Sequence, residues 1–250
     1  MVELKTAMSA GVATLTVSRP ERRNAIGAEL VEALLSAFAS LDSDPEVHAI
    51  ILTGVAPGFC AGSDLKELAT TDLSGMRAHE ARTAALARSI ALLDKPVIAA
   101  VSGFALGGGF VLAVSCDIVV TAPTTRWHLP EVTIGWIPPW GLNALVARVG
   151  PVAARRLTWG AAPFDGREAH RIGIADYLAS TDDSVLDAAF DRAKQLAALP
   201  SAAVSSTKQF FAPLVSGSAE AEDAWANRLF ASDCTNPVAQ ATLKRFGVRT

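Results

Sequence analysis

The sequence contains little cysteine and no cluster of metal-binding side chains. Its three cysteines, Cys60, Cys116 and Cys234, stand far apart in a chain of 250 residues. A dispersed, odd-numbered set fits neither a disulfide framework nor a CxxC zinc motif, and Asp and Glu show no metal-ligand spacing. We therefore expect buried thiols, no metal site and a reducing, cytoplasmic compartment.

Concentrated positive charge is also absent. The chain has 22 Lys and Arg against 25 Asp and Glu, a formal net charge of −3, and its basic residues are scattered. Nucleic-acid binding needs a basic patch that neutralises phosphates, so we predict no nucleic-acid partner. The residues from Met1 to Lys5 include an acid and no apolar h-region, which predicts that they are not a signal peptide.

One long uncharged run raises the question of a membrane span. No charged residue occurs from Pro96 to Cys116, which is long enough to cross a bilayer. However, the run begins with proline and is interrupted by Gly103 and by the glycines at 107–109, which weaken a helix. This pattern is typical of a buried strand, a glycine turn and a buried helix, so we predict no membrane span.

The first half of the chain alternates short strands with helices. Hydrophobic residues make up 50% of the sequence, enough for a large core. By periodicity, the expected strands cover residues 13–17, 48–53, 97–101 and 117–122, and the expected helices cover 26–41, 63–69, 76–93 and 110–116. Strands joined by helical crossovers predict a mainly parallel α/β sheet with functional loops at the strand ends.

The second half has a different character. From about Pro151 the sequence predicts alanine-rich helices, with one more strand near residues 174–179. After Pro200 the pattern is entirely helical, broken at Pro213 and Pro237. A soft boundary therefore falls near Pro200.

The first segment that points to chemistry is Gly58-Phe59-Cys60-Ala61-Gly62-Ser63-Asp64-Leu65-Lys66, between a strand and a helix. Glycine lets the backbone turn sharply there and leaves the N–H of Ser63 unpaired, so that it can bind an oxyanion. The alternative is an ordinary strand-to-helix connection in which Asp64 is a first-turn charge.

The second segment is Gly103-Phe104-Ala105-Leu106-Gly107-Gly108-Gly109-Phe110. Three successive glycines remove every Cβ at the start of a helix, so a ligand can press against backbone N–H groups. The Gly-x-Gly-x-x-Gly register and a Gly-Lys-Ser/Thr sequence are both missing, which excludes the dinucleotide and Walker A fingerprints. Tight helix packing remains the alternative explanation of the glycines.

The third segment runs from Trp127 to Gly141. Glu131 lies there among residues that are almost free of charge, a setting that raises its pKa and prepares it for proton transfer. A solvated loop glutamate is the alternative. Trp127, Trp136 and Trp140 either wall an acyl pocket or pack in the core.

Together these three segments resemble the crotonase, or enoyl-CoA hydratase/isomerase, superfamily. The matching elements are Arg19-Pro20, Asn24-Ala25, Ala61-Gly62-Ser63-Asp64-Leu65, Gly107 to Gly109 leading to Cys116-Asp117, and Pro130-Glu131 with Gly135 and Ile137-Pro138. The resemblance covers nearly the whole chain. It implies an α/β spiral of repeated ββα units over residues 1–199 and a C-terminal helical trimerisation region over residues 200–250.

The resemblance also implies what the protein binds. Acyl-CoA thioesters would be its substrates and homotrimers or hexamers its assembly, with no separate cofactor because CoA is part of the substrate. The family's two oxyanion donors fall on the backbone N–H groups of Ser63 and Gly108, where they would hold the thioester oxygen as it becomes an enolate. The positions implied to contact CoA are Ser63, Asp64, Leu65, Lys66 and Gly108.

One position departs from the hydratase pattern. Hydratases of this family generally use two glutamates that hold a water between them; Glu131 matches the second, but the first falls on Val111. Valine can neither accept nor deliver a proton, so the sequence favours chemistry that one carboxylate can manage. We therefore predict a Δ3,Δ2-enoyl-CoA isomerase with Glu131 as its sole acid/base.

Alternatives stay open at this point. The chain would still be an enoyl-CoA hydratase if another group, such as His128 or a bound water, replaced the missing acid, or it would bind acyl-CoA without turnover. A serine hydrolase is disfavoured because Leu65 stands where the last glycine of Gly-x-Ser-x-Gly belongs. Thiol catalysis is disfavoured because Cys60 and Cys116 have no evident partner base.

Overall fold

A six-stranded sheet forms the centre of the computed structural model, which describes residues 3–160 and 162–247. Its strands, in spatial order, are β1 (Glu3–Ser9), β2 (Val12–Ser18), β3 (Ala49–Gly54), β4 (Val97–Val101), β6 (Ile118–Thr121) and β8 (Tyr177–Leu178). β1 pairs with β2 in antiparallel fashion, and every later pair in this order is parallel. The prediction of a mainly parallel α/β sheet is confirmed.

A second layer of short extended segments lies beside the sheet. β5 (Phe104–Leu106) pairs in parallel with β7 (Arg126–His128). Isolated bridges in the same layer join Ile26 to Ser63, Cys60 to Ala105 and Trp127 to Phe164. Successive passages of the chain thus place a strand in the main sheet and a short segment in the second layer, as the implied two-strand units require.

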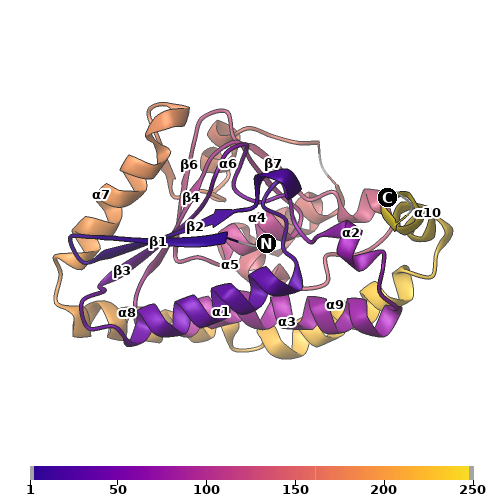
Figure 1. The fold of residues 1–250 in the computed structure, drawn as a ribbon, viewed down its shortest axis with the longest axis horizontal. Coiled ribbons are helices and arrows are strands. Elements are labelled where there is room, and N and C mark those ends of the chain that lie inside the picture. Colours follow the sequence, from indigo (N-terminus) through magenta and orange to yellow (C-terminus); the bar gives the residue numbers. More distant parts are fainter. Residues whose placement is uncertain (1–2, 161, 248–250) are drawn as a thin grey trace.

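Helices cover both faces of the main sheet. In Figure 1, α1 (Ala28–Ser43), α3 (Leu73–Leu92) and α9 (Ala219–Asp233) run along one side, and α7 (Val185–Ala197) lies on the other. The strand side chains alternate accordingly. Leu15 and Ile50 pack in the larger core with Phe38 of α1, whereas Val12 and Ile51 pack in the smaller core with α7.

The remaining helices connect and flank these layers. They are the 3-10 helices η1 (Pro20–Arg22), η2 (Glu131–Ile134) and η3 (Asp182–Ser184), and the α-helices α2 (Leu65–Leu68), α4 (Gly108–Val114), α5 (Leu142–Thr158), α6 (Gly166–Arg171), α8 (Ser201–Ser216) and α10 (Pro237–Gly247). α5 is kinked at Gly150, just before Pro151. The helical character predicted after Pro200 is confirmed by α8, α9 and α10.

Two expectations about these elements need correction: one strand is shorter than expected, and one expected helix break is absent. The strand expected over residues 174–179 is reduced to β8, because the N–H groups of Ile174 and Ala175 donate to the Ala169 carbonyl and close α6 instead. The break expected at Pro213 does not occur, and α8 continues to its end. Pro213 is exposed and lies in the last turn, so the helix loses little there.

The uncharged run from 96 to 116 is divided as predicted. The run forms, in order, β4, the turn that carries β5, and α4. The residues of α4 are all buried. Within the described ranges, no helix is both long enough and apolar enough to cross a membrane.

Candidate active site

Four of the six predicted site residues, Ser63, Leu65, Gly108 and Glu131, line a small cavity where α4 begins, whereas Asp64 and Lys66 do not. The cavity has a volume of about 70 Å³. It is lined by Ala61, Gly62, Ser63, Leu65, Leu68, Glu80, Gly107, Gly108, Val111, Pro130, Glu131, Ile134, Trp136, Pro138, Pro139 and Trp140. Two larger hollows, of about 740 and 840 Å³, lie under α8 and beside α5; Trp136 also borders the second, but neither contains Ser63, Gly108 or Glu131.

Two backbone nitrogens from different elements lie close together at this cavity. A Cβ built on Gly108 would lie 3.5 Å from the Ser63 nitrogen, and a Cβ on Gly62 would lie 3.1 Å from the Gly108 nitrogen. Gly108 is the first residue of α4, so its N–H has no partner within the helix. In the described part of the chain, neither the Ser63 nor the Gly108 N–H donates to another protein group, which leaves both available to one ligand oxygen.

The glycine run is what allows this close approach. Gly107 adopts φ 53° and ψ −127°, which side chains rarely permit, and a Cβ there would lie 2.7 Å from Oε1 of Glu131. A Cβ on Gly109 would lie 2.3 Å from the Cys60 carbonyl oxygen. Both explanations of the three glycines, ligand binding and tight helix packing, therefore apply, since the tight packing of α4 is what brings its first N–H to the cavity.

Glu131 is buried rather than solvated. It begins η2 and is 6% exposed, and its Oε2 is buried without any hydrogen-bond partner. Burial raises the pKa of Glu131 to about 8; its own backbone N–H opposes the shift and the nearby Glu80 carboxylate adds to it. A carboxyl group with such a pKa is suited to both give and take a proton near neutrality.

A second carboxylate in this cavity was missed by the sequence analysis. Glu80 of α3 is 2% exposed, and its Oε2 accepts a 2.7 Å hydrogen bond from the Trp140 indole N–H. Burial raises the pKa of Glu80, whereas the charge of His79 and hydrogen bonds from Trp140 and Ser63 lower it.

A signal for Glu80 was present in the sequence. It lies four residues after Met76 and three before Thr83, both buried, so a glutamate stands on the buried face of an otherwise ordinary amphipathic helix. That pattern predicts a buried carboxylate. It does not predict which cavity the carboxylate reaches, because this depends on how α3 packs against Trp140.

The segment after Ser63 is held in place by Asp64. The Asp64 carboxylate accepts from the N–H groups of Lys66 and Glu67 at 3.1 and 3.4 Å and pairs with Arg19 at 2.9 Å. Asp64 thus caps α2 and fixes the loop that presents the Ser63 N–H. Leu65 lines the cavity, and Lys66 is exposed at the surface.

The other candidates occupy supporting positions. The His128 backbone carbonyl accepts from the Gly107 N–H at 2.9 Å, but His128 is not part of the cavity wall. Trp136 and Trp140 line the cavity, whereas Trp127 packs edge-on against a core phenylalanine. Burial raises the pKa of the Cys60 thiol to about 12, which keeps it protonated and agrees with the prediction against thiol catalysis.

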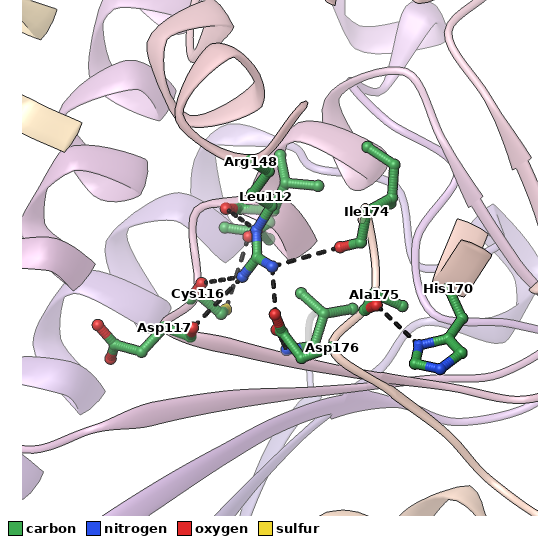
Figure 2. A network of polar contacts seen from close by, with 10 residues as sticks. Leu112, Cys116, Asp117, Arg148, His170, Ile174, Ala175 and Asp176 are labelled. Atoms are coloured by element: carbon green, nitrogen blue, oxygen red, sulfur yellow. Dashed lines mark hydrogen bonds and ion pairs between the residues drawn. The ribbon is translucent and has the colours of Figure 1, made fainter. Parts of the chain in front are cut away.

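The far end of α4 is anchored by Arg148 of α5. Figure 2 shows its guanidinium reaching several carbonyl oxygens and Asp176. It donates to the Val114 and Cys116 carbonyls at 3.0 and 2.7 Å and pairs with Asp176 at 2.9 Å. The carbonyls at the C-terminal end of α4 are thereby satisfied, which fixes the helix whose first residue is Gly108.

Arg148→Met should therefore destabilise the fold by about 3 kcal/mol, because buried carbonyls lose a charged donor. Urea unfolding followed by circular dichroism measures this. Arg171→Met is the matched control, since Arg171 is exposed and, among the residues the structure describes, pairs with Glu168 on its own helix alone, so the unfolding midpoint of this variant should barely move. Equal midpoints for the two variants would contradict the anchoring role.

Comparisons with known proteins identify the family. A family model described as enoyl-CoA hydratase/isomerase matches residues 7–246. The "Probable enoyl-CoA hydratase echA8" of Mycobacterium bovis is 36% identical over 178 residues, covering 71% of this chain and 68% of that protein. The human mitochondrial methylglutaconyl-CoA hydratase is 35% identical over 189 residues, covering 75% of this chain and 56% of that protein.

The likeness extends to solved structures. A crystal structure of an enoyl-CoA hydratase from Mycobacterium avium superposes with a TM-score of 0.86 at 27% identity, over 97% of this chain and 95% of that one. The superposition includes both the strand-rich core and the C-terminal helices, so the predicted fold class is confirmed. The chain belongs to the enoyl-CoA hydratase/isomerase, or crotonase, family.

Proposed function

We propose that this chain moves the double bond of a 3-enoyl-CoA to give the 2-enoyl-CoA, with Glu131 as the acid/base. The observation that carries the proposal is the buried, unpartnered Oε2 of Glu131 in the same cavity as the N–H groups of Ser63 and Gly108. These groups supply the two requirements of enolate chemistry, a base and an oxyanion site.

The reaction follows from this arrangement. Glu131 removes a proton from C2 of the bound thioester, and the electrons move onto the thioester oxygen. The Ser63 and Gly108 N–H groups then stabilise the dienolate by about 3 to 4 kcal/mol per donor. Glu131 returns a proton at C4, which completes the shift without a separate cofactor.

The remaining features of the proposal concern CoA and assembly. The segment of Ser63, Asp64, Leu65 and Lys66 would lie along CoA, with Asp64 acting by holding the loop rather than by touching the ligand. We also propose a homotrimer or hexamer, for which residues 200–250 would supply contacts, and a cytoplasmic location.

Hydration of a 2-enoyl-CoA is the second candidate. It is favoured by one observation, the presence of the Glu80 carboxylate in the same cavity as Glu131. Acyl-CoA binding without turnover is a third reading. It gives no role to a buried carboxyl group that is left without a partner beside two free N–H groups.

Incubation of 3-butenoyl-CoA with the native chain in D2O tests the proposal. Mass spectrometry should detect crotonyl-CoA that carries deuterium at C2 or C4, because the proton passes through a carboxyl group that exchanges with solvent. Recovery of 3-butenoyl-CoA unchanged, with binding detected by calorimetry, would contradict isomerisation. The four-carbon probe is chosen because the cavity, about 70 Å³, is small.

A further inference from the structure

Two buried carboxylates flank the start of α4. A Cβ on Gly107 would lie 2.7 Å from Oε1 of Glu131, and a Cβ on the next residue, Gly108, would lie 3.1 Å from Cζ2 of Trp140. The Trp140 indole N–H in turn donates to Glu80 at 2.7 Å. Since neighbouring Cα atoms are about 3.8 Å apart, Glu131 and the Trp140–Glu80 pair lie on adjacent parts of one cavity wall.

Glu80 has the Trp140 indole as a hydrogen-bond partner, whereas Oε2 of Glu131 has none. Burying a carboxylate without a cation costs several kcal/mol, so such groups are usually paired. In the described part of the chain, neither Glu80 nor Glu131 forms an ion pair with lysine or arginine. A glutamine at position 80 would accept from Trp140 equally well, so the indole contact alone does not require an ionisable group.

The missing acid of the hydratase pattern lies at the same cavity. Val111, one turn into α4, is part of its lining, together with Glu80 and Glu131. A carboxylate from α3 thus enters the space that faces the residue where hydratases carry their first glutamate. The cavity contains two carboxylates even though the sequence motif provides only one.

We propose that Glu80 is a second catalytic carboxylate and gives this site hydration activity on a 2-enoyl thioester. In the hydration step, Glu80 takes a proton from water as the water oxygen bonds to C3. The π electrons of the C2–C3 bond form the enolate held by Ser63 and Gly108. Protonated Glu131 then delivers its proton to C2, and exchange with solvent returns the proton of Glu80 to Glu131.

The surroundings of the two groups assign these roles. Burial raises the pKa of Glu80 as well, but hydrogen bonds from Trp140 and Ser63 oppose that rise, and these contacts stabilise the ionised form that a base needs. Glu131 has an unpartnered oxygen, and burial raises its pKa to about 8, which favours the protonated form an acid needs. Two carboxyl groups whose environments differ in this way divide into acid and base.

Hydration and the proposed isomerisation both need the Ser63 and Gly108 N–H groups to bind the thioester oxygen. The role of Glu80 therefore rests on this part of the proposed function. The two activities need Glu131 in opposite states, ionised to remove a C2 proton and protonated to deliver one. Both forms of a group with a pKa of about 8 are populated near neutrality. Isomerisation should therefore rise toward pH 8, whereas hydration should fall above it.

Other titratable groups near this pair are few. Those that act on Glu80 are Glu131 of η2, His79 of α3, the helix of Glu80 itself, and the thiol of Cys234, which follows α9. Burial raises the pKa of Cys234 to about 12, so the thiol stays neutral across the range tested. The pH profiles are thus set by Glu80 and Glu131.

The experiment compares Glu80→Gln with the native chain in two assays, hydration of crotonyl-CoA and isomerisation of 3-butenoyl-CoA. Hydration by the variant should fall by about 100-fold or more, because the water loses its base. Isomerisation, which uses Glu131, should stay within about threefold. Glu46→Gln is the matched control, because Glu46 is exposed in the loop before β3, and it should alter neither rate.

The outcomes separate the two proposals. Absence of crotonyl-CoA hydration by the native chain, or hydration by Glu80→Gln within threefold of native, would overturn the role of Glu80 whether or not isomerisation occurs. An equal fall of both rates in Glu80→Gln would identify a structural support and overturn it as well. Loss of hydration alone supports it, even if the native chain fails to isomerise 3-butenoyl-CoA.

Trp140→Phe provides a second variant in case Glu80→Gln fails to fold. It keeps an aromatic ring at position 140 but removes the N–H that favours ionised Glu80, so the pKa of Glu80 should rise. The acid limb of the hydration profile should then move to higher pH, whereas a merely structural contact would lower the rate equally at every pH. An unmoved acid limb would contradict the assignment of Glu80 as the base.

Discussion

Glu131→Gln is expected to lower double-bond migration in 3-butenoyl-CoA by about 1000-fold or more. Glutamine has nearly the same volume, so the cavity walls and the Ser63 and Gly108 N–H groups stay in place. An amide cannot accept the C2 proton, and the oxyanion site alone leaves only residual catalysis. Because binding contacts remain, kcat should fall far more than the affinity for the acyl-CoA.

Mass spectrometry of the product in samples quenched at successive times measures this loss, with Glu46→Gln as the control that should not change. Retention of more than a tenth of native kcat by Glu131→Gln would show that another group moves the C2 proton. In that case Glu80 would be the candidate, and the double variant Glu80→Gln/Glu131→Gln would be inactive. Hydration of crotonyl-CoA should fall in Glu131→Gln as well, and unchanged hydration would contradict the role of Glu131 as the acid that protonates C2.

The part of the site that local sequence predicted is built from backbone. The role of the glycines at 62 and 107–109 can be predicted from the local sequence, because no other residue permits those turns and that approach of α4 to the 60–63 loop. The same holds for Glu131, whose uncharged neighbours predicted its burial and raised pKa. These features do not depend on distant segments for their interpretation.

Glu80 shows why the rest was not predicted. Its role depends on α3 placing one turn against Trp140, which is 60 residues later in the chain, and spacing along the sequence does not encode that contact. The sequence therefore indicated a lone carboxylate, opposite Val111, and favoured single-base chemistry. The shortened strand β8 has a similar origin, since the end of α6 competes for the N–H groups of the expected strand.

Glu131→Gln is also expected to stabilise the protein, but only at pH values where ionisation of the buried native glutamate costs free energy. The folded pKa of Glu131 is about 8, above its ordinary value of 4.5. The native state therefore holds a proton that the unfolded state releases between these pH values. The stabilising contribution of the carboxyl group is complete below pH 4.5 and is lost as pH rises through 8.

The size of the effect follows from the pKa difference. At pH 8 the native chain should have lost up to about 4 kcal/mol that Glu131→Gln keeps, at about 1.4 kcal/mol per unit. Urea unfolding at pH 4.5 and pH 8 measures the difference, with Glu46→Gln as a control that should show none. Equal stability of Glu131→Gln and the native chain at pH 8 would mean that water or a cation stabilises the ionised carboxylate. A gain confined to high pH, accompanied by loss of turnover, would instead show that a proton-transferring group is maintained at the expense of stability, which is expected of an active-site carboxylate.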